Sequence, residues 1–167
     1  MKIAIIGKMC SGKSTIANSF MELNNNFQKL SFARKVKDIA TDLFDMNEKN
    51  RKLLQQIGTY MREIDPDVWA NYVIKQSNNC EFVVIDDLRY KNEYDLLKKN
   101  NFKIIKLVIS DKLQFIRLKN TYSLTYKNHL NNLNHESEMF TDTINDKDVD
   151  LVINIDNNDN IETIIKN

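Results

Sequence analysis

The clearest chemistry in the chain lies in eight residues near its start, Gly7-Lys8-Met9-Cys10-Ser11-Gly12-Lys13-Ser14, which follow the pattern G-x-x-x-x-G-K-[ST]. The glycines let the backbone curl so that successive N–H groups point at phosphate oxygens. Lys13 can reach the β- and γ-phosphates of a nucleoside triphosphate, and the Ser14 hydroxyl can bind Mg²⁺. We therefore predict a triphosphate site in this phosphate loop. Its expected contacts are Lys8, Cys10, Ser11, Gly12, Lys13, Ser14 and Thr15.

The segments around the phosphate loop favour a strand before it, Lys2–Ile6, and a helix after it, Thr15–Met21. Strands and helices then alternate along the chain. The expected strands are Phe27–Ser31, Phe82–Ile85, Lys103–Ile109 and Leu151–Ile155. The expected helices are Phe32–Phe44, Lys49–Ile64 with a break near Gly58, Pro66–Ser77 capped by Asp65, Tyr90–Lys99, a helix capped by Asp111 that ends near Thr121, and Ile161–Lys166. This alternation predicts a doubly wound α/β fold with a parallel sheet.

Two adjacent carboxylates, Asp86 and Asp87, follow the apolar run Phe82–Ile85. Ligands of such sheets bind at the carboxyl ends of the strands. If this strand lies beside the first one, we expect the carboxylate pair to face the Mg²⁺ ion and the phosphates. A polar strand end without such a role is the alternative for both residues.

Composition narrows the class of protein. The 167 residues suggest one domain, and a formal net charge of +1 marks no surface for nucleic acid. The two cysteines, Cys10 and Cys80, have no metal-site or disulfide spacing, so we expect a reducing compartment. The short apolar run at the start does not predict a signal peptide, and no run has membrane-spanning length. We expect a cytoplasmic protein without a membrane partner, in the host cytoplasm if the chain is encoded by a virus.

Glycine placement argues against a GTPase switch. Such switches use an Asp-x-x-Gly segment, whereas Gly58 is the one glycine after the loop and Gln55 stands where the Asp is required. A small kinase that passes the γ-phosphoryl group to a small acceptor remains. Kinases of this kind need a second anion site and a lid that carries arginines. The chain has five arginines, Arg34, Arg51, Arg62, Arg89 and Arg117.

Four further segments resemble phage-type deoxynucleoside monophosphate kinases. Gly58–Trp69 resembles their segment G-T-x-x-R-x-x-x-P-x-x-W, and Asp87–Glu93 resembles D-x-R-[FY]-x-N-E. Ser31–Lys37 is similar to F-A-x-x-[LV]-K, and His135–Glu138 is similar to the lid element H-x-S-E. Together with the phosphate loop, five segments match in order over roughly residues 1–155.

The resemblance implies an adenylate-kinase-like five-stranded parallel sheet with flanking helices. Residues 1–167 would form one P-loop kinase domain, with helices that bind the acceptor at about 32–79 and a short lid at about 117–140. The implied reaction transfers phosphate from ATP, with Mg²⁺, to a (deoxy)nucleoside monophosphate.

The resemblance also implies roles for single residues. Lys37, Arg62, Trp69 and Arg89 would contact the acceptor, and a core position is the alternative for Trp69. The catalytic residues would be Lys13, Asp87, Arg89 and Arg117, and the metal ligands Ser14 and Asp87, since the motif register favours Asp87 over Asp86. His135 would be a lid contact or a surface residue.

Several alternatives stay open at this stage. Arg34 and Lys35 stand where many relatives have Asp-Pro, which leaves the base preference open. Deoxy or ribo preference and a monomer or homodimer are also open. The nearest rivals are a P-loop kinase for dephospho-coenzyme A or phosphomevalonate and a nucleotide-binding regulator without turnover.

Overall fold

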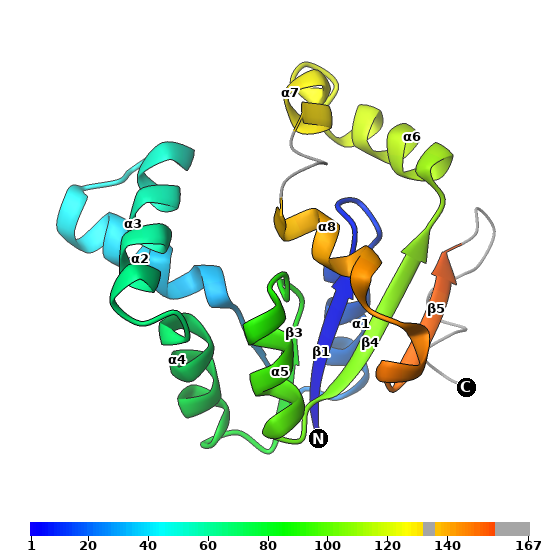
Figure 1. Ribbon diagram of the computed structural model, residues 1–167, viewed down its shortest axis with the longest axis horizontal. Coiled ribbons are helices and arrows are strands. Elements are labelled where there is room, and N and C mark those ends of the chain that lie inside the picture. Colours follow the sequence, from blue (N-terminus) through cyan, green and yellow to red (C-terminus); the bar gives the residue numbers. More distant parts are fainter. Residues whose placement is uncertain (132–135, 156–167) are drawn as a thin grey trace.

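Five parallel strands form one sheet with the order β2-β3-β1-β4-β5 (Figure 1). The computed structural model describes residues 1–131 and 136–155, so the expected helix Ile161–Lys166 and His135 lie outside the described residues. The strands are β1 (Lys2–Gly7), β2 (Phe27–Leu30), β3 (Phe82–Ile85), β4 (Lys103–Ile109) and β5 (Leu151–Ile155). The helices are α1 (Lys13–Leu23), α2 (Phe32–Phe44), α3 (Arg51–Ile64), α4 (Val68–Ser77), α5 (Lys91–Lys99), α6 (Asp111–Thr121), α7 (Tyr126–Asn131) and α8 (Glu136–Thr143), with the 3₁₀ turn η1 (Asp146–Asp148).

Strand β1 lies at the centre of the sheet and is buried on both faces. Its residues Ile3 and Ile5 belong to one apolar core, and Ala4 and Ile6 belong to the other. This alternation follows from the two-residue period of a strand. Strand β3 is a direct neighbour of β1 and runs parallel to it, with Ala4 paired to Ile85. The phosphate loop and the carboxylates after β3 therefore lie together at the carboxyl end of the sheet.

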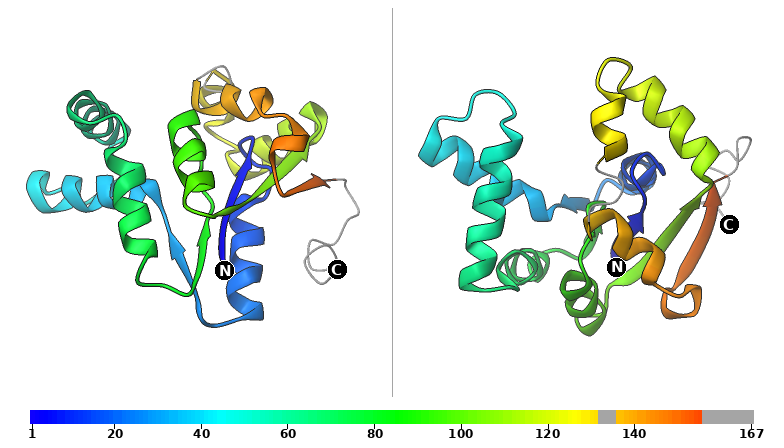
Figure 2. Two further views of the ribbon diagram at one scale, coloured as in Figure 1. Left: turned by 60° about the horizontal axis from the view of Figure 1, so that its bottom comes forward. Right: turned by 45° about the horizontal axis from the view of Figure 1, so that its top comes forward.

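The helices cover both faces of the sheet, and three of them form an arm at one side. Helix α1 and the start of α6 pack on the face of Ile3 and Ile5. The opposite core includes residues of α4 and α5. Helices α2, α3 and α4 extend beyond the β2 edge of the sheet and form this helical arm (Figures 1 and 2).

The predicted α/β class and parallel sheet are confirmed, whereas the expected break at Gly58 and the expected helix start at Pro66 were wrong. Helix α3 runs through Gly58 without a break. This glycine is buried, and its own carbonyl oxygen accepts hydrogen bonds from the Arg62 and Trp69 side chains, each at 3.2 Å. Helix α4 starts at Val68 rather than Pro66, since Asp65 and Pro66 form the turn that precedes it.

Helix α8 packs firmly against the body of the protein. Its residues Glu138 and Thr141 are 5% and 4% exposed, and the Phe140 ring contacts Tyr94 of α5 at a centroid distance of 6.2 Å. The expected lid at about 117–140 therefore ends in a helix that is fixed on the sheet. The division into an acceptor segment and a lid stays a prediction.

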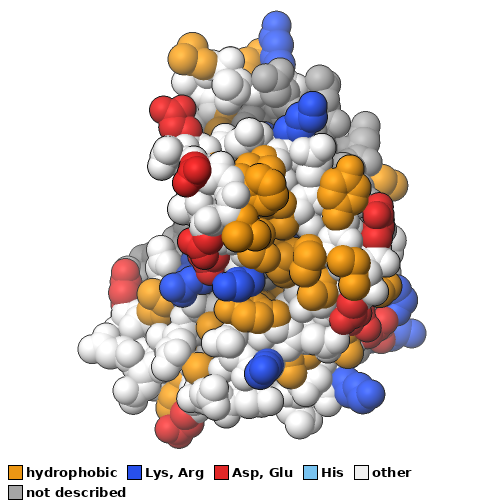
Figure 3. Space-filling view, turned by 90° about the vertical axis from the view of Figure 1, so that its left-hand side faces the viewer, with side chains coloured by type: hydrophobic (Ala, Val, Ile, Leu, Met, Phe, Trp, Pro, Cys, Tyr) orange, Lys and Arg blue, Asp and Glu red, His pale blue; other side chains and the backbone are white. Residues whose placement is uncertain are grey.

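The outer face of the helical arm carries exposed apolar side chains. Leu43 and Phe44 at the end of α2 and Tyr60 and Ile64 in α3 are each more than half exposed. Figure 3 shows hydrophobic side chains gathered on this side of the molecule, with charged residues around them. The homodimer alternative stays a prediction.

In the described part of the chain, no helix is both long enough and apolar enough to span a membrane.

Asp87 fastens the arm to the end of β3. Its carboxylate accepts hydrogen bonds from the Ser31 hydroxyl at 2.6 Å and from the backbone N–H groups of Phe32 and Ala33 at 3.2 and 3.0 Å. These N–H groups belong to the first turn of α2 and have no partner within the helix. Burial raises the pKa of Asp87, although these three donors favour the ionised form. The position of α2 therefore depends on this carboxylate.

Replacing Asp87 by Asn should lower the free energy of unfolding by about 1 to 3 kcal/mol, because the amide offers one acceptor oxygen where the carboxylate satisfies three donors. Chemical denaturation at pH 7 measures the change. Asp95→Asn is the matched control, since Asp95 makes an exposed ion pair with Lys91 on α5. Equal stability of Asp87→Asn and the control would show that α2 is held in another way.

Candidate active site

The phosphate loop has the curled backbone that its sequence predicts. Cys10 and Gly12 adopt positive φ angles of 62° and 100°. A Cβ atom on Gly7 would lie 2.7 Å from the Ser11 hydroxyl oxygen, so a side chain does not fit there. The Ser11 side chain is fully buried beneath the loop, and its hydroxyl has no hydrogen-bond partner among the described residues. The Ser11 backbone N–H donates to the Lys8 carbonyl oxygen at 3.2 Å, so among the described residues Ser11 shapes the loop from beneath.

A cavity of about 1180 Å³ opens in front of the loop, and we call it the donor cavity. Cys10, Gly12, Lys13, Ser14 and Thr15 line it, as the motif predicts. The Lys8 side chain is not among its lining residues. Instead, the Lys8 ammonium pairs with Asp111 of α6 and Asp142 of α8, both at 3.3 Å, which anchors the loop to the two helices.

Lys13 lies folded over the loop. Its ammonium group donates to the carbonyl oxygens of Gly7 and Lys8 at 2.6 and 2.8 Å. Burial lowers the pKa of Lys13 to about 8, and the nearby Arg89 guanidinium acts in the same direction, while Glu138 and Asp86 oppose the shift. A triphosphate beside this ammonium would stabilise its charge.

The two carboxylates after β3 have different surroundings. Both oxygens of Asp87 accept hydrogen bonds from the start of α2, and Asp87 also lines the donor cavity, so its expected role as a metal ligand stays a prediction. Asp86 lines the donor cavity together with Ser14 and pairs with Lys29 of β2 at 2.7 Å. Carboxylate and hydroxyl oxygens suit Mg²⁺, which usually takes few protein ligands in addition to substrate phosphates. Ser14 and Asp86 therefore fit a magnesium ion, and Asp87 fixes α2.

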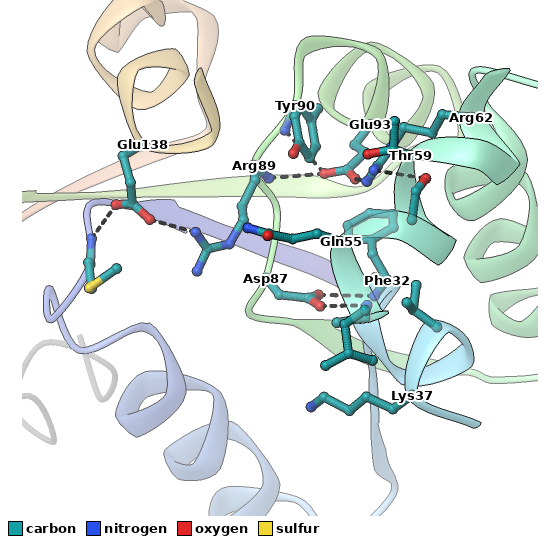
Figure 4. Close-up of a pocket in the computed structure, with 15 residues that line it drawn as sticks. Phe32, Lys37, Gln55, Thr59, Arg62, Asp87, Arg89, Tyr90, Glu93 and Glu138 are labelled. Carbon is teal, nitrogen blue, oxygen red and sulfur yellow. Dashed lines mark hydrogen bonds and ion pairs between the residues drawn. The ribbon is translucent and has the colours of Figure 1, made fainter. Parts of the chain in front are cut away.

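A second cavity of about 660 Å³ adjoins the first, and we call it the acceptor cavity. Five residues line both cavities: Met9, Ala33, Lys37, Asp87 and Arg89. Figure 4 shows that side chains from the phosphate loop, α2, α3, α5 and α8 converge here. The structure thus brings Lys37 and Arg89, two of the expected acceptor contacts, to the boundary between the two cavities.

Arg62 lines the acceptor cavity and is held from three sides. Its guanidinium donates to the Gly58 carbonyl oxygen at 3.2 Å and lies over the Tyr90 ring, 4.6 Å from the centroid. It also lies 3.9 Å from Glu93, which is 3% exposed. Burial raises the pKa of Glu93 to about 7, although the N–H groups of Arg89 and Tyr90 donate to its carboxylate. Glu93 therefore lies beside the Arg62 guanidinium and also fixes the backbone of Arg89.

Trp69 is a core residue and not part of the acceptor surface. Its side chain is 3% exposed, and its indole N–H donates to the Gly58 carbonyl oxygen at 3.2 Å. It lines neither cavity. The expectation of a substrate contact was wrong, because α3 and α4 cross at Gly58 and enclose the ring between them.

Arg89 and Arg117 reach the phosphate loop from different elements. The Arg89 guanidinium pairs with Glu138 of α8 at 2.5 Å, and the same carboxylate accepts from the Met9 N–H at 2.7 Å. Arg117 of α6 donates to the carbonyl oxygens of Cys10 and Ser11, both at 3.4 Å, and lines the donor cavity. Both arginines therefore lie beside the loop, and their catalytic roles stay predictions.

The chain was compared with known proteins and structures. A family model described as an AAA domain (AAA_18) matches residues 3–141, more than half of the chain. The chain belongs to this AAA domain family. No curated protein matches the sequence.

Solved structures resemble this AAA domain over almost its whole length. Shikimate kinase from Aquifex aeolicus is 18% identical with a TM-score of 0.55, and the match covers 99% of this chain and 92% of that one. A gluconokinase from Sinorhizobium meliloti is 13% identical with a TM-score of 0.56, covering 99% and 87%. TT1252 from Thermus thermophilus is 14% identical with a TM-score of 0.63, covering 99% and 94%. At these identities the likeness establishes the fold, which is that of P-loop small-molecule kinases.

Sequence reasoning missed several residues that the structure places at the cavities. Glu93 and Glu138 stood inside quoted motifs, but nothing local gave them partners 31 and 49 positions away. Gln55 and Thr59 of α3 also line the acceptor cavity. Their spacing of four puts them on one face of the helix, and this was the signal that could have found them.

The lowered pKa of Lys13 predicts that ATP binding takes up a proton at alkaline pH. At pH 8.5 the amine is mostly neutral, because its pKa is about 8, and a bound triphosphate raises that pKa. Calorimetry in two buffers of different ionisation enthalpy should show an uptake of roughly half a proton or more per ATP. The affinity should fall as the pH rises from 7 to about 9.

The matched variant for this measurement is Lys13→Met, which removes the amine and keeps most of the side-chain length. It should bind ATP weakly and without proton uptake. Proton uptake that persists in Lys13→Met would assign the titration to another group.

Proposed function

We propose that this AAA domain protein transfers the γ-phosphoryl group of ATP, with Mg²⁺, to a (deoxy)nucleoside 5′-monophosphate and so forms the diphosphate. The observation that carries the proposal is the pair of adjoining cavities, one at the phosphate loop and one lined by Lys37, Arg62 and Arg89. A site that only binds ATP has no need of a second group of cations. A phosphate acceptor does need one, since its anion must approach the triphosphate.

The acceptor cavity has two kinds of wall. Phe32, Val36 and Leu54 offer an apolar surface, on which a nucleobase can stack or pack. Gln55 and Thr59 add amide and hydroxyl groups that can bind polar edges. The three cations lie in the same cavity, so one monophosphate can meet both kinds of wall.

The reaction needs little proton chemistry from the protein. An acceptor phosphate has a second pKa near ~6, so at neutral pH it is largely the dianion and can attack without a general base. The task of the protein is to align the two substrates and to balance charge as the phosphoryl group moves. Lys13, Arg89 and Arg117 are placed for that work beside the donor cavity.

A magnesium ion would be held by Ser14, with Asp86 beside it, and by the phosphates of ATP. When bound, the ion neutralises charge on the phosphate oxygens. The Ser14 hydroxyl and the Asp86 carboxylate would supply oxygen ligands for the ion in the cavity that Lys13 also lines. Asp87 contributes by holding α2, and with it Lys37, at the acceptor cavity.

The similar structures include kinases named for other acceptors, shikimate and gluconate. Dephospho-coenzyme A and phosphomevalonate are further rivals, because each is a small acceptor that carries phosphate. The three cations of the acceptor cavity suit an anionic acceptor, a carboxylate such as shikimate or gluconate as well as a phosphate, and the apolar wall of Phe32, Val36 and Leu54 supports a nucleobase. The presence of these cations also argues against a regulator that binds nucleotide without turnover.

An ADP-release assay with MgATP and a panel of acceptors tests the proposal. The panel holds the common ribo- and deoxynucleoside monophosphates, dephospho-coenzyme A, phosphomevalonate, shikimate and gluconate. We expect ADP release that depends on at least one nucleoside monophosphate and that falls by about 100-fold or more in Lys13→Ala. The absence of turnover with every nucleotide would contradict the proposal.

Arg62→Ala should raise the KM for the acceptor by about 10-fold or more and leave the KM for ATP nearly unchanged. The reason is that Arg62 lines the acceptor cavity and does not line the donor cavity. Lys52→Ala is the matched control: it removes a positive charge from the exposed surface of the same helix. Steady-state kinetics with both substrates varied gives the two constants. A rise in the KM for ATP with an unchanged KM for the acceptor would reverse the assignment of the cavities.

A further inference from the structure

We infer that Glu138 is a positioning residue that holds Arg89 against the phosphate loop, at the point where the donor and acceptor cavities meet. The inference rests on the proposed function, because the phosphoryl group would pass at this boundary. Glu138 lines the acceptor cavity, but in this account it binds no substrate. It acts through the guanidinium of Arg89.

Both carboxylate oxygens of Glu138 are in use. Oε1 receives the Arg89 guanidinium at 2.5 Å, and Oε2 receives the backbone N–H of Met9 at 2.7 Å (Figure 4). Met9 belongs to the phosphate loop, and Arg89 follows the end of β3. One side chain therefore connects the donor loop to the cation that lines both cavities.

The helix that carries Glu138 is rigidly placed. Glu138 and Thr141 are buried, and Phe140 packs on Tyr94. One turn further along, Asp142 pairs with Lys8 of the phosphate loop at 3.3 Å. Helix α8 is thus fixed to the loop by two carboxylates, so Glu138 can define the direction of a partner side chain.

Arg89 has few other constraints on its guanidinium. Its side chain is 37% exposed, and Glu138 is the carboxylate that pairs with it in the described part of the chain. Its backbone N–H is held separately by Glu93 at 3.0 Å. A long side chain pays an entropic cost when a ligand orders it, and a fixed carboxylate removes that cost before the substrate arrives. An arginine has five N–H donors, so pairing with Glu138 leaves several for a phosphate.

A different role would follow if Glu138 only competed with phosphate for Arg89 and the Met9 N–H. Removing its charge would then strengthen ATP binding. A positioning role predicts instead a loss of rate at nearly constant ATP affinity, since the orientation of Arg89 matters most in the transition state.

The test compares wild-type protein with Glu138→Gln, which keeps the shape of the side chain and removes the charge. We expect kcat to fall by about 100-fold with a nearly unchanged KM for ATP. In an Arg89→Ala background the same change should cost little further activity, because its effect passes through Arg89. Asp146→Asn, which removes the ion pair with Lys106 at 2.9 Å, is a control that should keep full kcat.

A second readout does not depend on turnover. NMR of the arginine side chains should show a slowly rotating Arg89 guanidinium in wild-type protein and fast rotation in Glu138→Gln, while thermal unfolding checks that both variants fold. If wild-type protein phosphorylates no nucleotide, the proposed function fails and this measurement still decides the role of Glu138. Fast rotation in wild-type protein, tighter ATP binding in Glu138→Gln, or a full loss of rate by Glu138→Gln in Arg89→Ala would each overturn the inference.

Discussion

Repulsion among the positive charges gathered at the carboxyl end of the sheet is the constraint on which the site depends. The parallel order of β1 and β3 brings the phosphate loop and Asp86 to the same edge, and helices α2, α3 and α6 add cations around it. Burial lowers the pKa of Lys13 to about 8, and the nearby Arg89 guanidinium acts in the same direction. Such crowding is costly in a protein by itself and becomes favourable beside phosphate anions.

The structure balances these cations with carboxylates from different elements. Glu138 of α8 pairs with Arg89, Glu93 of α5 lies beneath Arg62, and Asp86 pairs with Lys29. Each of these carboxylates is almost fully buried, so each pair fixes the direction of its cation as well as its charge. Burying an ionised carboxylate costs free energy, and the raised pKa of Glu93 reflects this cost.

The sequence predicted the parts of the site that depend on local spacing. The motif Gly7–Ser14 and the order of the elements gave the phosphate loop and the sheet, since a glycine turn between strand and helix is a local property. The role of Asp87 in holding α2 could not be predicted from the sequence, because its partners at the start of α2 lie more than 50 positions away. The expected contact of Trp69 with the acceptor was wrong for a similar reason, since only the crossing of α3 and α4 determines that its ring is enclosed.

The central claim is that the two cavities hold two polyanions at the same time, with Lys13 at one and Arg62 at the other. Calorimetry with a bisubstrate analogue, adenosine joined to a second nucleoside through five phosphates, tests it most directly. The account predicts one analogue per chain, bound at least about 100-fold more tightly than ATP, and weaker binding in both Lys13→Ala and Arg62→Ala. An affinity equal to that of ATP and unaffected by Arg62→Ala would contradict it.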